Sequence, residues 1–151
     1  MASDALNKQI LEEIRGLDSN PITGIVVEQN GKNAIHVSIS GPEGSPYEGG
    51  VFKFDMSLSD DYPKVAPKVK FITKIYHPNI DNRGNVSLDI LQDKWNPSFQ
   101  IRTVLEKFHA LLSDPKPDDS LDNEINDLWK KNEQQAIKAA KEWTAMYAIV
   151  F

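Results

Sequence analysis

The sequence contains no cysteine among its 151 residues. This absence excludes a disulfide framework and any metal site built on thiolates. Three histidines, scattered along the chain, are the only soft metal ligands left. We therefore expect neither a structural metal nor a bound cofactor.

Long hydrophobic runs are also lacking. No stretch approaches the ~18 consecutive apolar residues that a membrane span requires. The N-terminus, Met1 to Asp4, lacks the basic head and apolar core of a secretion signal. These absences predict a soluble protein of the cytoplasm and nucleus, with no membrane attachment.

Positive charge is scarce, since 17 basic residues face 22 acidic ones and the net charge is −5. No run of Lys and Arg is long enough to make the concentrated positive surface that nucleic-acid binding needs. The 40% hydrophobic and 26% charged content suits a chain that buries a core unaided. We expect residues 1–151 to form a single domain that does not bind nucleic acid.

Apolar spacing predicts the order of the secondary structure. Helical periodicity runs from Asp4 to Leu17, with Gly16 and Pro21 as stop signals. Alternating or continuous apolar residues then predict four strands of an antiparallel meander, at Ile22 to Glu28, Ala34 to Ser40, Val51 to Leu58 and Val69 to Ile72.

After Ile75 the periodicity disappears for about 25 residues, a length typical of binding or catalytic loops. Helical spacing returns in three later segments, at Ile101 to Leu112, Ile125 to Trp129 and Ile137 to Tyr147. The order helix, four strands, long loop and three helices predicts an α+β fold. We expect the chemistry to lie in the long loop.

Several polar residues of this region have two interpretations. His77 beside Pro78 suits a structural, hydrogen-bonded histidine better than a catalyst. Asn79 could be a turn residue or an amide donor to a developing oxyanion. Ser87 has no His or Lys close in sequence to act as its base and no glycine-flanked nucleophile elbow, which makes a serine hydrolase implausible. Asp118 and Asp119 could cap a helix or position an amine.

The motifs occur in a characteristic order: His77-Pro78-Asn79-Ile80, then Val86 to Leu91, Trp95-Asn96-Pro97, and finally Leu111-Leu112 with Pro115, Pro117, Asp118 and Asp119. This order resembles that of ubiquitin-conjugating enzymes, and the resemblance extends from Leu6 to Ala148. It implies the fold of that family, with an N-terminal helix, a four-stranded antiparallel meander, a long active-site loop and three C-terminal helices. It implies ubiquitin and the ubiquitin-activating enzyme as partners.

The resemblance also implies roles for individual residues. Ser87 stands where the family has the cysteine that accepts ubiquitin as a thioester. Asn79 would stabilise the oxyanion when a lysine attacks, and His77 would brace the loop that carries Asn79. Asp119 would orient the incoming lysine and help to deprotonate it, and Asp89 would support the loop. Ser120 departs from the family, which usually has proline there, and we expect the chain beside the site to be looser.

Four segments most resemble the branch that builds ubiquitin chains through lysine sixty-three of ubiquitin: Ala66 to Phe71, Thr73 to Tyr76, Gln100 to Leu105 and Trp129 to Glu133. Such enzymes form a heterodimer with a catalytically inactive variant of the same family, and Asp55 and Lys70 keep the expected charge at its docking face. Ser57 replaces a large aromatic there, and such anchors often contribute ~2 kcal/mol or more.

Ligases of the RING or U-box type would bind two loops, formed by Tyr62, Pro63 and Lys64 and by Trp95, Pro97 and Ser98. Lys64 replaces an apolar residue of the family, so it would offer a charge, while Pro97 would supply an apolar contact.

Three functions remain open. The chain is a ubiquitin-conjugating enzyme whose cysteine was replaced by Ser87, a natural non-catalytic variant that acts as a binding partner, or a conjugating enzyme for another ubiquitin-like modifier. The intact loop from His77 to Asp89 favours a deliberate cysteine-to-serine replacement, which would leave an inactive or ester-trapping form. The lack of insertions around this loop weakens the third function.

Overall fold

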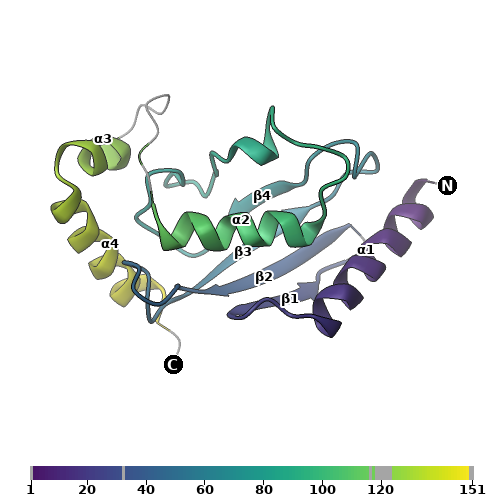
Figure 1. The fold of residues 1–151 in the computed structure, drawn as a ribbon, viewed down its shortest axis with the longest axis horizontal. Helices are drawn as coiled ribbons and strands as arrows, with labels where there is room; N and C mark the ends of the chain where they lie inside the picture. The colour runs from purple at the N-terminus through teal and green to yellow at the C-terminus, as the bar shows by residue number, and fades with distance from the viewer. Residues whose placement is uncertain (1, 32, 116, 118–123, 150–151) are drawn as a thin grey trace.

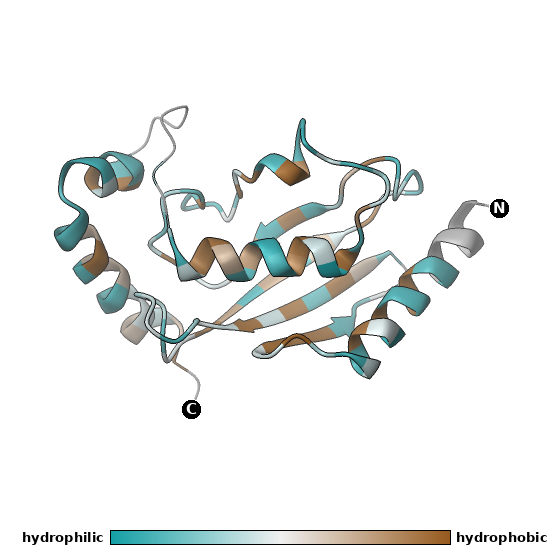
Figure 2. Cartoon of the chain, viewed as in Figure 1, coloured by the Kyte–Doolittle hydropathy of each residue, from teal (hydrophilic) through white to brown (hydrophobic). Residues whose placement is uncertain are grey.

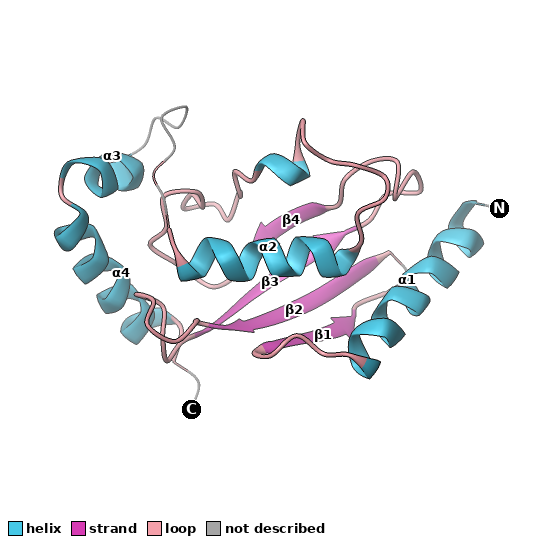
Figure 3. Cartoon of the chain, viewed as in Figure 1, coloured by secondary structure: helices cyan, strands magenta, loops and turns pink. Residues whose placement is uncertain are grey.

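The computed structural model describes residues 2–31, 33–115, 117 and 124–149. The elements in chain order are α1 (Ala2–Ser19), β1 (Ile25–Gln29), β2 (Ala34–Ser40), β3 (Val51–Ser57), β4 (Lys68–Phe71), the 3-10 turn η1 (Asp89–Leu91), α2 (Ile101–Ser113), α3 (Glu124–Lys131) and α4 (Glu133–Tyr147). Figures 1 and 3 show α2 lying across the sheet, α1 at one end of the molecule, and α3 and α4 at the other.

The four strands form an antiparallel sheet in the order β1-β2-β3-β4. Alternate residues of β2 and β3 are buried and face α2, as the hydrophobic stripes in Figure 2 illustrate. The Phe54 and Phe108 rings stack with their centroids 4.7 Å apart, joining β3 to α2. The core therefore lies between one face of the sheet and α2.

The predicted α+β fold, with its meander and three later helices, is confirmed. The largest difference at a strand boundary is the start of β1, at Ile25 and not at Ile22. The end of β1, the end of β3 and both ends of β4 differ from the predicted bounds by one residue each. The Ile25 N–H donates to the Ile22 carbonyl in a turn that requires Gly24 at φ +83°. Within the part of the chain that the structure describes, no helix is long and apolar enough to cross a membrane.

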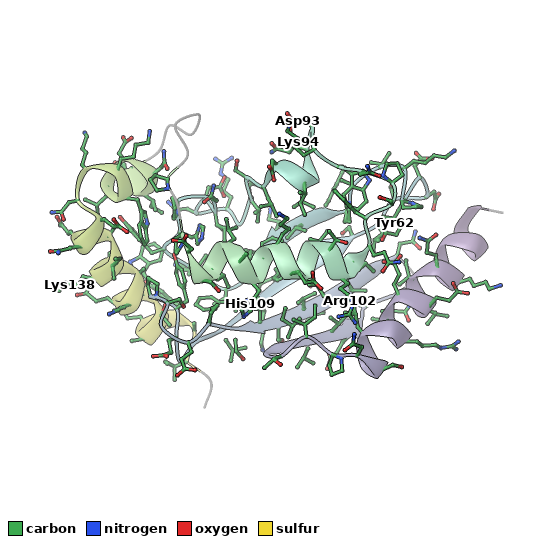
Figure 4. The ribbon with its side chains drawn as sticks, viewed as in Figure 1. Tyr62, Asp93, Lys94, Arg102, His109 and Lys138 are labelled. Carbon is green, nitrogen blue, oxygen red and sulfur yellow. The ribbon has the colours of Figure 1, made fainter. Side chains whose placement is uncertain are left out.

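Glu13 joins α1 to the start of α2. Its carboxylate accepts hydrogen bonds from the Tyr62 hydroxyl at 2.9 Å and from the Ile101 N–H at 2.7 Å. Burial and the Glu13 charge raise the pKa of Tyr62, so this hydroxyl remains a donor. Nearby, the Arg102 side chain donates to the carbonyl groups of Gly16 and Asn20 at the end of α1 (Figure 4). These bonds fix α1 against the loops that lead to α2.

Replacing Glu13 by Ala is expected to lower the free energy of unfolding by roughly 2 kcal/mol, because it leaves two part-buried donors without their acceptor. Urea denaturation measures the loss. Glu12→Ala is the matched control, since Glu12 is the exposed neighbour on the same helix. An equal loss in both variants would contradict the role given to Glu13.

Candidate active site

The segment after β4 folds back onto the edge of the sheet. The Phe71 N–H donates to the Gly84 carbonyl at 2.9 Å, and Lys70 forms a β-bridge with Asn85. Gly84 has φ +86°, and a Cβ at this position would lie 2.2 Å from the Phe71 carbonyl oxygen. Only glycine permits this close approach, which fixes the chain three residues before Ser87.

Asp81 holds the turn that leads to Gly84. Its carboxylate accepts bonds from the Arg83 N–H at 2.8 Å and from the backbone and side-chain N–H groups of Asn85, each at 2.9 Å. Burial alone would raise the pKa of Asp81, but the hydrogen bonds from Asn85 and Arg83 outweigh it and lower the pKa. Asp81 is not among the residues predicted from the sequence, although an Asp three positions before a Gly is a typical turn signal.

His77 is fully buried, and both of its ring nitrogens are occupied. Nδ1 accepts the Asn79 N–H at 3.0 Å, so Nε2 carries the proton and donates to the Leu111 carbonyl at 3.0 Å. The Tyr47 ring stacks on the imidazole with centroids 5.6 Å apart. With no free nitrogen, His77 cannot act as a base for Ser87.

Burial lowers the pKa of His77 to about 4, below its usual value of 6.5, since desolvation disfavours the charged form. In the unfolded chain the imidazole binds a proton near pH 6.5, so below that pH the unfolded state binds more protons. The stabilisation is therefore complete above pH 6.5 and is lost as the pH falls toward 4.

We expect His77 to make the free energy of unfolding fall by roughly 3 kcal/mol between pH 7 and pH 4. Urea denaturation at several pH values, on this chain and on His77→Gln, measures the effect. The variant keeps His36 and His109, so the difference between the two curves reports the missing imidazole. Parallel curves would contradict the burial of a neutral imidazole.

Asn79 and Ser87 lie side by side. The Ser87 N–H donates to the Asn79 backbone carbonyl at 2.7 Å. Both residues line a hollow of about 280 Å³, together with Pro78, Asp81, Asn85, Val86 and Gln92. Within the described residues, the side-chain oxygen of Asn79 is buried and has no hydrogen-bond partner. Such an unpaired buried group calls for a functional explanation.

Asp119 and Asp89 are the two acidic residues predicted to act at the site. Asp119 lies outside the described residues. Asp89 is exposed and opens η1, where its backbone carbonyl accepts the N–H groups of Gln92 and Lys94, each at 3.0 Å. These two bonds join the main chain of Asp89 to the residues that follow η1.

The two loops predicted to bind a ligase lie against each other. The Trp95 indole N–H donates to the Pro63 carbonyl at 2.8 Å, and the Tyr62 and Trp95 ring centroids are 6.2 Å apart. Lys64, Pro97 and Ser98 are exposed beside this contact. The predicted surface is thus continuous in space, although its two halves are about 30 residues apart in sequence.

The face of the sheet opposite α2 carries the residues predicted to bind a variant partner. Asp55 pairs in register with Lys70, and the exposed Ser57 pairs with Lys68. The Nδ1 atom of His36, on the neighbouring strand β2, lies 2.7 Å from a carboxylate oxygen of Asp55, within hydrogen-bond distance.

The hollow presents a weakly acidic hydroxyl beside a side-chain amide. Both ring nitrogens of His77 are used by Leu111 and Asn79, and in the part of the chain that the structure describes no cluster of His, Asp or Glu could hold a metal ion. A more acidic nucleophile at position 87, with the amide of Asn79 beside it, would suit acyl transfer.

Comparisons with known proteins show the family to which this fold belongs. The model of the family described as "Ubiquitin-conjugating enzyme" matches residues 9–144. The chain is 51% identical to "Ubiquitin-conjugating enzyme E2 N" of Drosophila melanogaster over 147 residues, which cover 96% of this chain and 97% of that protein. It is 50% identical to "Ubiquitin-conjugating enzyme E2 13" of Saccharomyces cerevisiae over 146 residues, 95% of each chain. The chain therefore belongs to the ubiquitin-conjugating enzyme family.

Proposed function

We propose that this chain is a conjugating-enzyme core, spanning residues 1–151, in which serine has been deliberately placed at the position of the catalytic cysteine. With cysteine at position 87, the thiolate would attack the thioester carbonyl of ubiquitin on the activating enzyme. A new carbon–sulfur bond forms, and the thiolate of the activating enzyme leaves. The amine of an acceptor lysine then attacks the new thioester, giving an amide and freeing the thiolate.

The observation that carries this proposal is the pairing of Asn79 with Ser87 in one hollow. The main-chain bond at 2.7 Å holds the two residues together, while the Asn79 side-chain oxygen takes no partner within the described residues. An amide whose oxygen is not held by the fold can be oriented with its N–H toward an oxyanion. In the proposed mechanism His77 braces the loop, Asp89 supports it, and Asp119 orients the attacking amine.

With Ser87 the same attack would give an ester, and a hydroxyl is a much poorer nucleophile than a thiol near neutral pH. We therefore propose that this form is inactive or holds ubiquitin as a slowly cleaved ester. The relatives named E2 N and E2 13, at about 50% identity, support the branch that builds chains through lysine sixty-three.

The proposed chain-building reaction uses a variant partner docked on the sheet face at Asp55 and Lys70. Ser57 would contribute less to that interface than the aromatic residue of the branch. A RING or U-box ligase would bind the surface made by the two loops at Pro63 and Trp95.

Chain linkage tests this function. The Ser87→Cys form, mixed with activating enzyme, ATP, ubiquitin and a variant partner, is expected to build chains in which nearly all linkages use lysine sixty-three of ubiquitin. Mass spectrometry of digested chains measures the linkage. Ubiquitin with arginine at that position is the control and should give no chains. Chains of mixed linkage would contradict the assignment to this branch.

A further inference from the structure

A second hollow, of about 570 Å³, lies on the other side of the Asp81 turn from Ser87. The segment after β4 contributes Ile72 and Lys74 to it, and α4 contributes Trp143 and Tyr147. Residues 80–84 form its third side. Its volume is typical of ligand sites in proteins, which range over roughly 300–1,000 Å³.

Aromatic and aliphatic surface is open to solvent in this hollow. Ile72 and Tyr147 are 55% and 45% exposed. The Trp143 ring meets Tyr147 edge-on, with centroids 5.6 Å apart, and the Lys74 ammonium lies 5.1 Å from the centre of the Tyr147 ring. Contiguous exposed apolar groups of this kind mark interaction sites more often than single exposed residues do.

The hollow also carries positive charge on a chain whose net charge is −5. Lys74 and Arg83 line it, and neither forms a direct ion pair with a carboxylate in the described part of the chain. The acidic residue of the lining, Asp81, is occupied by hydrogen bonds from Arg83 and Asn85. Lys74 and Arg83 outnumber Asp81, the one carboxylate of the lining, so the hollow keeps a net positive charge that favours carboxylates of a ligand.

The hollow continues past Trp143 into a third one, of about 540 Å³, which shares Asp81, Asn82 and Trp143 with it. Together they make an elongated groove, which suits an extended chain better than a compact molecule. Glu124 lines only this third hollow, whereas Lys74 and Arg83 line only the second, so acidic ligand groups would be drawn toward the second hollow.

We propose that this groove docks an extended segment of a partner protein in which a bulky apolar side chain is flanked by carboxylates. The apolar side chain packs between Ile72, Trp143 and Tyr147, and the carboxylates pair with Lys74 and Arg83. The groove shares the Asp81 turn with the hollow at Ser87 but uses neither Ser87 nor Asn79. The docking site is therefore independent of the proposed transfer reaction.

Nitrogen-15 NMR of this chain tests the proposal with a pentapeptide probe, acetyl-Asp-Asp-Phe-Asp-Asp-amide. We expect the indole N–H of Trp143 and the amides of Ile72 and Arg83 to shift at peptide concentrations up to roughly 1 mM, as suits a weak transient contact. Peptides with Ser in place of each Asp, or Ala in place of Phe, should bind about tenfold more weakly. No shift at Trp143 would overturn the site, and equal binding of the Ser peptide would overturn the role of charge.

Charge-reversal variants locate the contact. Lys74→Glu and Arg83→Glu should each weaken the probe about tenfold, whereas Lys138→Glu should not, because Lys138 projects from the outer side of α4 (Figure 4). Thermal melting checks that all three variants fold. Equal weakening by Lys138→Glu would overturn the site, since it would indicate a response to net charge alone. Equally tight binding of N-acetylphenylalanine would overturn the choice of a peptide.

Discussion

Replacing Ser87 with cysteine is expected to increase charging with ubiquitin by on the order of 10³-fold or more. A thiol with a pKa of ~8.5 is a few per cent ionised near neutral pH, whereas a serine hydroxyl is essentially un-ionised. His77 gives this hydroxyl no base, since both of its ring nitrogens are used by Asn79 and Leu111. Replacing the side-chain oxygen by sulfur should therefore restore charging with ubiquitin.

The measurement is a charging reaction with activating enzyme, ATP and ubiquitin, followed on gels with reductant, without reductant, and after alkali. The cysteine form should give an adduct that reductant cleaves, and this chain should give at most one that resists reductant and yields to alkali. Ser98→Cys is the matched control, since it places an exposed thiol on another loop. If Ser87→Cys stays uncharged, the chain is a binding variant or serves another modifier.

Local patterns were enough to predict the sheet and the helices. The alternation of Ile35, Val37 and Ile39 specifies one buried face, and the sequence placed β2 at Ala34–Ser40, as observed. The start of β1 was harder to predict from the sequence, because the apolar residues continue through a turn that depends on the positive φ of Gly24. Strand existence follows from periodicity, while a strand end depends on backbone conformation.

The candidate site depended more on contacts between distant residues. The sequence places Asn79 and Ser87 in one loop. The hydrogen bond from the Ser87 N–H to the Asn79 carbonyl depends on the turns closed by Ile80 and Gly84, which the structure shows. His77 reaches Leu111, 34 residues away, and Trp95 reaches Pro63, 32 residues away. The first pair joins the loop to α2 and the second joins two loops, so both depend on tertiary packing, and no local spacing encodes them.

In the Ser87→Cys form, replacing Asn79 with Ala is expected to slow transfer to lysine about 100-fold, because the amide donor to the oxyanion is lost. Charging should change only a few-fold. The geometry favours a separate effect on the two steps. The backbone carbonyl of Asn79 accepts the N–H of Ser87, and the backbone N–H of Asn79 donates to Nδ1 of His77. Alanine keeps both main-chain bonds, so the substitution removes the side chain without undoing the loop.

Single-turnover assays separate the two steps: charging is measured as thioester formation, and discharge is measured by adding free lysine or ubiquitin to the purified thioester. Asn82→Ala is the matched control, because Asn82 lies exposed in the same loop. Its discharge rate should stay close to that of the Ser87→Cys form. Equal slowing of charging and discharge by Asn79→Ala would contradict an oxyanion role for the amide, since that role acts when the amine attacks. Such a result would mean that the side chain shapes the hollow around position 87, and the unpaired oxygen would then have a structural cause.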